Sequence, residues 1–411
     1  MRTIYQYFKK GNDLTANFYN REMTAILKDR GALLILLFAL FIYPIIYGIA
    51  YQREVLRELP VAVVDLDKTA ASRQLTRMID ATEQLKAVPN IHSLAEAEEL
   101  FHRGEINGII VISDQLEKKM LRGEQAVVSV YCDAGYLLMY KQTLSGTLRA
   151  SGTFAAGVEI KRYLAKGASW EQAHEMRDPV ALNAHLLYNP AGGYNTFILP
   201  GLLVILLQQT LLIGIGLLGG TQTELGRQHF AVPMQLNRGS VLPVLLGKAG
   251  AYMTLYIINT IITQIWVFHW FNLPFKGTFL PGLAVMLPFL LAVTFLGLGL
   301  STLFKRREHS ILFMVFLSPI ILFVSGLSWP ISAIPQWLQV GAKIFPSTLA
   351  VPAMIRVNIM GAQVQHITSE IGGLLLQAAI YFILALILFY RVSQKREITP
   401  DDKKETKKGV Q

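Results

Sequence analysis

The sequence has little charge and almost no cysteine. Charged residues make up 16% of the 411-residue chain, whereas an ordinary soluble domain has about 25%. The single cysteine, Cys132, excludes an intramolecular disulfide framework and any Cys-x-x-Cys metal or redox pair. The stability of the fold therefore has to come from packing.

Motifs for hydrolytic or metal chemistry are also missing. The eight histidines show neither His-x-His nor His-x-x-x-His spacing, and no Gly-x-Ser-x-Gly nucleophile elbow occurs. Asp65 and Asp67 form an acidic pair, but Lys68 follows them at the end of an expected strand, which favours a turn over a cation site. The sequence predicts no catalytic residue and no metal site.

Two stretches imitate nucleotide-binding loops. Residues 214–219 match Gly-x-Gly-x-x-Gly, but they lie in an apolar run with no preceding strand, so close helix packing is the favoured interpretation. Gly247-Lys248 resembles the end of a phosphate-binding loop, but Leu242 stands at the position of its first glycine and Ala249 at that of its Ser or Thr. Without a Walker A loop, the chain is not expected to hydrolyse ATP or to bind a cofactor itself.

Long apolar runs are what the sequence does contain. Hydrophobic residues make up 52% of the chain and gather into charge-free stretches long enough to cross a hydrocarbon core of about 30 Å. We expect an α-helical polytopic membrane protein with about six spans. The expected spans are residues 31–51, 195–219, 249–271, 281–304, a fifth from about 310, and 371–390, with spans two to six inside 191–390.

The net charge of +10 is interpreted as membrane topology, not as a nucleic-acid surface, because the basic residues lie beside the apolar runs. Lys and Arg are frequent before span one, between spans two and three, between spans four and five, and after span six. The opposite connections hold only Lys276, and Lys343 with Arg356. The positive-inside rule therefore predicts cytoplasmic termini, including a charged tail at 391–411.

Residues 52–190 differ in composition from the rest and are expected to form an extracytoplasmic α/β domain with a helical stalk. Period-two apolar runs predict strands, and period-3.6 patterns predict helices. The expected strands are 61–64, 108–112 and 126–131, and the expected helices are 72–82, 94–101, 115–121 and 137–164.

Two further segments have unusual patterns. In the N-terminal segment 1–30, Tyr19, Met23 and Ile26 share a helical face, which fits either an amphipathic helix in the membrane interface or a helix packed on its own protein. Residues 326–360 are apolar but interrupted by prolines, which predicts re-entrant or interfacial half-helices.

The spans have almost no ionisable residue near their middles, which counts against a secondary transporter with an ion relay. Amide and hydroxyl side chains do occur there. They could line a substrate path or hold helices together, and the second role is the more common one. The candidates for a substrate path are Gln208, Gln209, Asn259, Thr263 and Gln264.

The order of several motifs resembles that of ABC type-2 transporter permeases over nearly the whole chain. The motifs are Leu59-Pro60-Val61 through Asp67 at the start of the insert, and Glu224, Gly226 and Arg227 after span two. A C-terminal signature of Ser325, Gly326, Pro330, Pro335, Pro346 and Arg356 completes the set. The family's docking segment usually carries a Glu-rich stretch that ends in Gly-Thr, whereas Arg227 follows Gly226 here.

The resemblance, closest to the multidrug-exporter branch, implies a permease subunit of an ATP-driven exporter in a bacterial inner membrane. A separate ATPase would bind ATP and Mg and dock on the segment 221–240 and on the face of Tyr19, Met23 and Ile26. A second permease copy or paralogue, a periplasmic adaptor and an outer-membrane channel are the other implied partners, with amphiphilic or drug-like cargo. The alternative is a membrane-anchored receptor or assembly factor whose external domain binds a protein.

Overall fold

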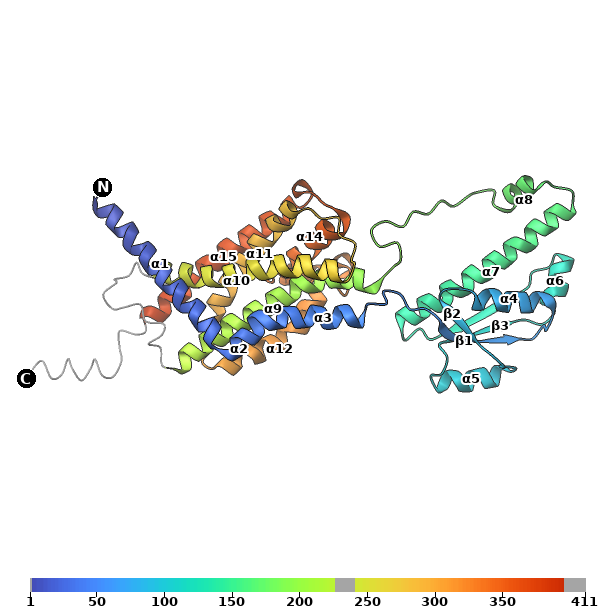
Figure 1. The fold of residues 1–411 in the computed structure, drawn as a ribbon, viewed down its shortest axis with the longest axis horizontal. Coiled ribbons are helices and arrows are strands. Elements are labelled where there is room, and N and C mark those ends of the chain that lie inside the picture. Colours follow the sequence, from blue (N-terminus) through green and yellow to red (C-terminus); the bar gives the residue numbers. More distant parts are fainter. Residues whose placement is uncertain (1, 226–240, 395–411) are drawn as a thin grey trace, which may run out of the picture. The chain divides into compact units, whose positions relative to one another are not determined.

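The computed structural model describes residues 2–225 and 241–394, which form two compact units (Figure 1). The α/β unit is Val55–His185, and the helical unit contains the chain before and after it. The α/β unit lies within the expected insert of residues 52–190. Each unit has a hydrophobic core of its own.

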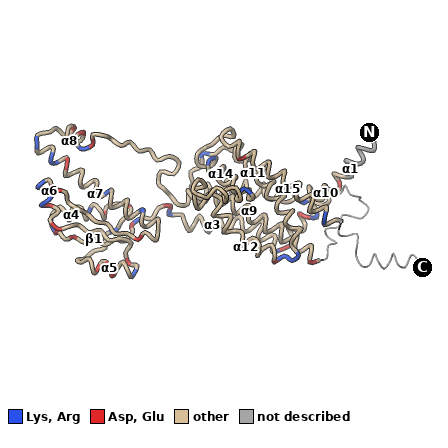
Figure 2. Tube along the Cα trace, turned by 180° about the vertical axis from the view of Figure 1, so that it is seen from behind, with Lys and Arg blue, Asp and Glu red and all other residues tan. Residues whose placement is uncertain are grey.

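Six helices of the described chain are long and apolar enough to cross a membrane, which confirms the expected fold class. The first is a continuous run of α2 (Arg30–Leu33), the π-helix η1 (Leu34–Phe38) and α3 (Ala39–Ala50). The others are α9 (Tyr194–Glu224), α10 (Val241–Trp270), α11 (Phe279–Ser301), α12 (Arg307–Val324) and α15 (Thr368–Gln394). Their charged residues gather toward the helix ends (Figure 2).

The central helix of this unit is α9, which packs against α11, α12, α14 and the first span. Its glycines permit the close approach. A Cβ at Gly214 would lie 2.2 Å from Leu36, and one at Gly220 would lie 2.6 Å from the backbone of Arg306. The Gly-x-Gly-x-x-Gly match is therefore a helix-packing surface, as the apolar context predicted.

The third span begins earlier than the sequence analysis expected. Its expected start is residue 249, whereas α10 begins at Val241 and carries Lys248 in its second turn. A lysine next to an apolar run normally indicates the edge of a span, but Lys248 is 4% exposed and pairs with Glu22. A partnered charge does not end a helix.

The proline-rich region folds into two short helices, α13 (Gln336–Ala342) and α14 (Ser347–Met360), bent by 91° at the break between them. This is the geometry of a broken span or a re-entrant loop, as the sequence predicted for residues 326–360. Single 3₁₀ turns flank the pair, η3 (Ile331–Ala333) and η4 (Val364–His366).

The α/β unit is a four-stranded sheet in the order β2-β1-β3-β4. The strands are β1 (Leu59–Asp65), β2 (Leu85–Val88), β3 (Gly108–Ile112) and β4 (Val128–Cys132). The central strand β1 pairs in parallel with β2 and β3, and β4 is antiparallel to β3. Val61 and Val63 face one core while Ala62 and Val64 face the other, because side chains alternate along a strand.

Helices cover both faces of this sheet. The helices α4 (Ala70–Asp80) and α7 (Leu137–Ala165) contribute to one core, and α5 (Leu94–His102) contributes to the other. The remaining helices are α6 (Leu116–Arg122) and α8 (Trp170–Arg177). The three expected strands and four expected helices are confirmed, but β2 was missed because its four residues are too few to show a period.

The turn after β1 is the expected one. The Asp65 carboxylate accepts hydrogen bonds from the backbone N–H groups of Asp67 and Lys68 at 3.0 and 2.9 Å, and from the Ser72 hydroxyl at 2.7 Å. Asp67 accepts from the Thr69 hydroxyl at 2.5 Å. Both carboxylates therefore shape the start of α4, as the turn interpretation predicted.

Candidate functional site

The N-terminal helix α1 (Arg2–Lys28) packs on α10 of its own protein. Phe18, Glu22 and Ile26 are buried and lie four residues apart, so they form one stripe of the helix. The backbones come very close, since a Cβ at Gly247 would lie 2.5 Å from the Thr15 carbonyl oxygen. Of the two alternatives for this helix, the structure shows packing on the protein itself for residues 15–26.

A buried polar cluster lies at this contact and joins three helices. We call Glu22, Gln222, Lys248 and Tyr252 the Glu22 cluster. The Lys248 ammonium donates to the Glu22 carboxylate at 2.7 Å and to the Gln222 amide oxygen at 3.0 Å. The Tyr252 hydroxyl donates to the other Glu22 oxygen at 2.7 Å. Because the charges are paired and hydrogen-bonded, they can be buried, and they tie α1 to the end of α9 and the start of α10.

A second polar group, the Asp29 cluster, consists of Asp29, Glu224 and Arg307. Asp29 caps α2 by accepting from the backbone N–H groups of Gly31 and Ala32 at 2.9 and 3.0 Å. The Arg307 guanidinium lies 3.3 Å from the same Asp29 oxygen, and the Arg307 backbone N–H donates to Glu224 at 3.1 Å. Glu224 thus sits at the N-terminus of α12, where a carboxylate is favoured.

The predicted ATPase-coupling residues fall around these clusters. Tyr19 and Met23 are half-buried beside the Phe18 stripe, and Ile26 is buried within it. Glu224 remains exposed while it caps α12. Gly226 and Arg227, with the rest of the segment 226–240, lie outside the described residues. As ATPase contacts, all of these residues stay predictions.

The predicted substrate-path residues are spread over several contacts. Gln208 accepts from the Ser347 backbone N–H at 2.9 Å, at the N-terminus of α14, and Gln209 accepts from the Ser318 hydroxyl of α12. Asn259 donates to the Leu36 carbonyl at 3.0 Å, inside η1. Thr263 donates to the Asn259 carbonyl of its own helix at 2.7 Å. These four positions connect or stabilise helices, which is the more common role of amide and hydroxyl side chains in membrane helices.

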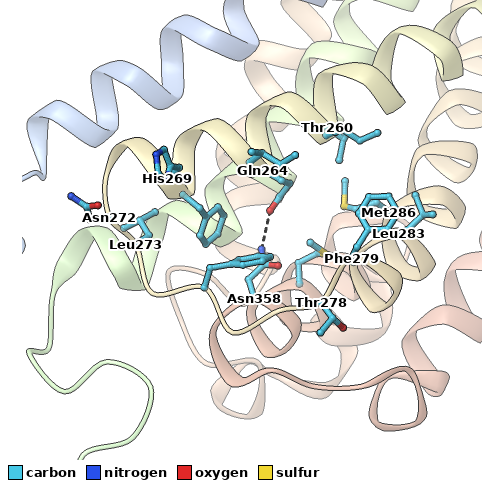
Figure 3. A pocket seen from close by; sticks show the side chains of 16 residues that line it. Thr260, Gln264, His269, Asn272, Leu273, Thr278, Phe279, Leu283, Met286 and Asn358 are labelled. Atoms are coloured by element: carbon cyan, nitrogen blue, oxygen red, sulfur yellow. Dashed lines mark hydrogen bonds between the residues drawn. The ribbon is translucent and has the colours of Figure 1, made fainter.

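Gln264 differs, because it faces a cavity of about 680 Å³ (Figure 3). Its amide oxygen accepts from Asn358 of α14 at 3.0 Å. The other walls come from α11, with Leu283 and Met286, and from the connection 271–278. The cavity volume lies within the roughly 300–1,000 Å³ of small-molecule sites.

The C-terminal signature residues shape the proline-rich region. Gly326 has φ +82°, where a side chain would be strained, and a Cβ there would lie 2.6 Å from Ile331. Pro330, Pro335 and Pro346 each stand just before a helix, at η3, α13 and α14. Ser325 is fully buried and donates to the Leu322 carbonyl at 2.8 Å.

The last member of the signature makes an ion pair. Arg356 of α14 pairs with Glu370 of α15, and it also donates to the His366 carbonyl at 3.3 Å. This contact joins the bent pair to the last span.

Neither Glu22 nor its pairing with Lys248 was identified from the sequence. The available signal was a lone acid on an apolar stripe of one helix together with a lone base inside an apolar run of another. Two such positions, 226 residues apart, are paired only by the tertiary fold.

The helical unit with its six candidate spans defines a class, the multi-pass membrane proteins, and comparison with known proteins gives the family. Residues 30–387 match the ABC-2 family transporter proteins, and the chain belongs to that family. It is therefore a non-catalytic transmembrane subunit, and permeases of this family pair with ATPase subunits. The chain is 24% identical over 352 residues to the linearmycin resistance permease protein LnrN of Bacillus subtilis (strain 168), covering 79% of this chain and 86% of LnrN. No solved structure matches the chain.

Proposed function

We propose that this chain is the membrane-spanning half of an ATP-driven exporter in a bacterial inner membrane, energised by a separate ATPase that carries ATP and Mg. Family membership supports the permease role. The observation that carries the coupling argument is the Glu22 cluster, which fastens α1, α9 and α10 together where the segment 221–240 begins.

In this mechanism the ATPase pushes on the coupling segment around Glu224, Gly226 and Arg227 and on the exposed side of α1. Because the Glu22 cluster holds α1 against α10, a push on either is passed to both helices as a rigid body. The Asp29 cluster transmits the movement of α9 to the start of α12 and to the first span. The two clusters together join the starts or ends of four spans.

The test is affinity purification of the tagged chain from its native membrane in mild detergent, followed by mass spectrometry and an ATPase assay. We expect a P-loop ATPase and vanadate-sensitive hydrolysis. A pure preparation without any ATPase contradicts the proposal and favours the receptor or assembly-factor alternative. Finding an ATPase gene next to this one would be an inexpensive early discriminator.

The cargo we propose is amphiphilic or drug-like, moved outward. The name of LnrN, a linearmycin resistance permease, supports removal of an antibiotic as the biological role. The apolar spans with scattered amides also suit an amphiphile. A strain that lacks this chain should be more sensitive to such compounds, and growth inhibition across an amphiphile panel measures that. Unchanged sensitivity throughout contradicts the cargo class.

Two further parts of the proposal rest on the resemblance to multidrug-type members. The permease works with a second copy or paralogue, and the α/β unit, on the outer side, contacts a periplasmic adaptor that leads to an outer-membrane channel. Val55–His185 is a compact unit with its own core, so it can be removed as a unit to test that contact. Deletion of residues 60–185 should abolish co-purification of an adaptor, and an adaptor that persists refutes the contact.

A further inference from the structure

The residues that line the cavity beside Gln264 favour an uncharged ligand. None of its sixteen lining residues is Asp, Glu, Lys or Arg. The walls are aliphatic, aromatic and Met side chains, and the polar groups are a few amides, hydroxyls and His269. Such a lining disfavours a charged group, because an ion buried without a counter-charge loses its hydration at high cost.

Two polar atoms in this apolar lining lack partners. The Thr260 hydroxyl and the Gln264 amide nitrogen are buried and have no hydrogen-bond partner among the described residues. Thr260 is 7% exposed, and both side chains belong to the α10 wall of the cavity (Figure 3). Because buried polar groups are nearly always hydrogen-bonded, the two side chains have unused donors, and a rotation that brings either donor to the cavity surface would let it bind a ligand oxygen.

The position of the cavity along α10 indicates its depth in the membrane. It begins near the end of α10, where Trp266 and Trp270 lie with ring centroids 4.8 Å apart, and tryptophan favours the membrane–water interface. From Trp270 to Thr260 the helix rises by about 15 Å, which is half of a hydrocarbon core of about 30 Å. Ile265 and Phe279, which line the cavity, are 64% and 68% exposed. Since these side chains both line the cavity and are exposed, we infer that the cavity opens sideways, toward the leaflet at the level of Trp266 and Trp270.

From this geometry we propose that the cavity between α10, α11 and α14 binds an uncharged amphiphile: an apolar chain or ring body that carries a carbonyl, ester or hydroxyl oxygen. The apolar body occupies the space beside Leu283 and Met286, and the oxygen accepts a hydrogen bond from Gln264 or Thr260. The ligand enters sideways from the leaflet. Its source is either the acyl-ester part of a bilayer lipid, whose headgroup stays outside the cavity, or a separate molecule on its way to export, and only the second source rests on the proposed function.

Gly282 allows a clean test of the cavity. It lines the cavity, and a Cβ built there meets no atom within 4 Å, so the side chain of Gly282→Leu starts in open space and is expected to occupy part of the cavity. Leucine also suits a helix better than glycine does, so the variant is expected to fold. Gly372 of α15 likewise has open space around its Cβ but does not line the cavity, so Gly372→Leu is the matched control.

The experiment uses the purified full chain in lipid nanodiscs, without any ATPase. The probe is a monoacylglycerol with a photoactivatable diazirine in its acyl chain, and mass spectrometry maps the crosslinks. We expect crosslinks within residues 260–286 and 354–358, lost in Gly282→Leu and retained in Gly372→Leu. The matched fatty acid, ionised at alkaline pH, should crosslink there much less. Crosslinks that are indifferent to Gly282→Leu, or that lie only on other helix faces, overturn the proposal.

Two further experiments test the hydrogen bond to Gln264 and the source of the ligand. Gln264→Leu should remove the preference for the monoacylglycerol over a diazirine-bearing hydrocarbon of the same length, and an unchanged preference contradicts the hydrogen-bonding role. A phospholipid with the same photoactivatable chain identifies the source of the ligand. Phospholipid labelling that is lost in Gly282→Leu shows that bilayer lipid occupies the cavity. Strong labelling by the monoacylglycerol without labelling by the phospholipid shows that the ligand is a separate amphiphile. Because no ATPase is present, a failure of the exporter proposal leaves these results unaffected.

Discussion

At the residue scale, the side chains of Glu22 and Lys248 are each only 5% exposed, so either one becomes costly once its partner is removed. Lys248→Met keeps the volume of the side chain but leaves the Glu22 carboxylate buried without its counter-charge. We expect the free energy of unfolding to fall by about 3–5 kcal/mol. The measurement is thermal unfolding of the purified protein in detergent.

Two control variants test whether the loss of stability comes from the buried ion pair: one removes an exposed lysine, and the other removes both charges of the pair. Lys343→Met removes an exposed lysine of the helical unit and should leave the unfolding temperature nearly unchanged. The double variant Glu22→Leu with Lys248→Met removes both charges and should be more stable than Lys248→Met alone. Equal unfolding temperatures for Lys248→Met and Lys343→Met would show that the ion pair does not stabilise the fold.

Glu224 offers a second prediction, because it has a structural contact in addition to its predicted ATPase contact. Glu224→Ala removes the acceptor for the Arg307 backbone N–H, at a cost of about 1 kcal/mol, whereas Glu224→Gln keeps an oxygen there. If the charge docks the ATPase, both variants should reduce substrate-stimulated ATPase activity. Loss in Glu224→Ala alone assigns the residue only to capping, and no loss in either excludes it from docking.

At the scale of the elements, α9 depends on the glycines that face its neighbours. At Gly220 an added Cβ would lie 2.6 Å from the carbonyl carbon and oxygen of Arg306 and 2.7 Å from the Cα of Arg307, so backbone would have to move. We expect Gly220→Ala to destabilise the protein by about 1–3 kcal/mol, measured by thermal unfolding. Gly372→Ala, in open space, is the neutral control, and an equal effect of the two would contradict close packing as the role of Gly220.

At the scale of the whole molecule, the single cysteine can report the side on which the α/β unit lies. Cys132 is half-buried at the end of β4, and burial, with a smaller contribution from the Asp133 carboxylate, raises the pKa of its thiol. A raised pKa leaves less thiolate at neutral pH. Maleimide labelling should therefore be faster at about pH 9 than at about pH 7, since the thiolate is the nucleophile.

If the α/β unit faces outward, a membrane-impermeant maleimide should label Cys132 in intact spheroplasts. Cys132→Ser is the unlabelled control, and cells that have been lysed give the full extent of labelling. Labelling that appears only after lysis would place the unit in the cytoplasm and contradict the orientation predicted from the Lys and Arg distribution.

The sequence determined the features that depend on composition and period. Long charge-free runs give spanning helices because lipid offers no hydrogen-bond partner to the backbone, so the six spans were predictable before any contact was known. The α/β character of the insert followed from alternating apolar runs such as Val61–Val64. Glycine spacing within 214–220 was enough to predict close helix packing.

Only the tertiary structure decided which polar side chains meet. Glu22 and Lys248 pair across 226 positions, Asn259 reaches the carbonyl of Leu36 in a π-helical turn, and Gln264 alone among the candidate path residues faces the cavity. A polar residue in an apolar run has the same local pattern whether it holds helices together, pairs a charge or contacts a ligand. Its role is set by the partner that packing brings to it, and that partner lies far away in the sequence.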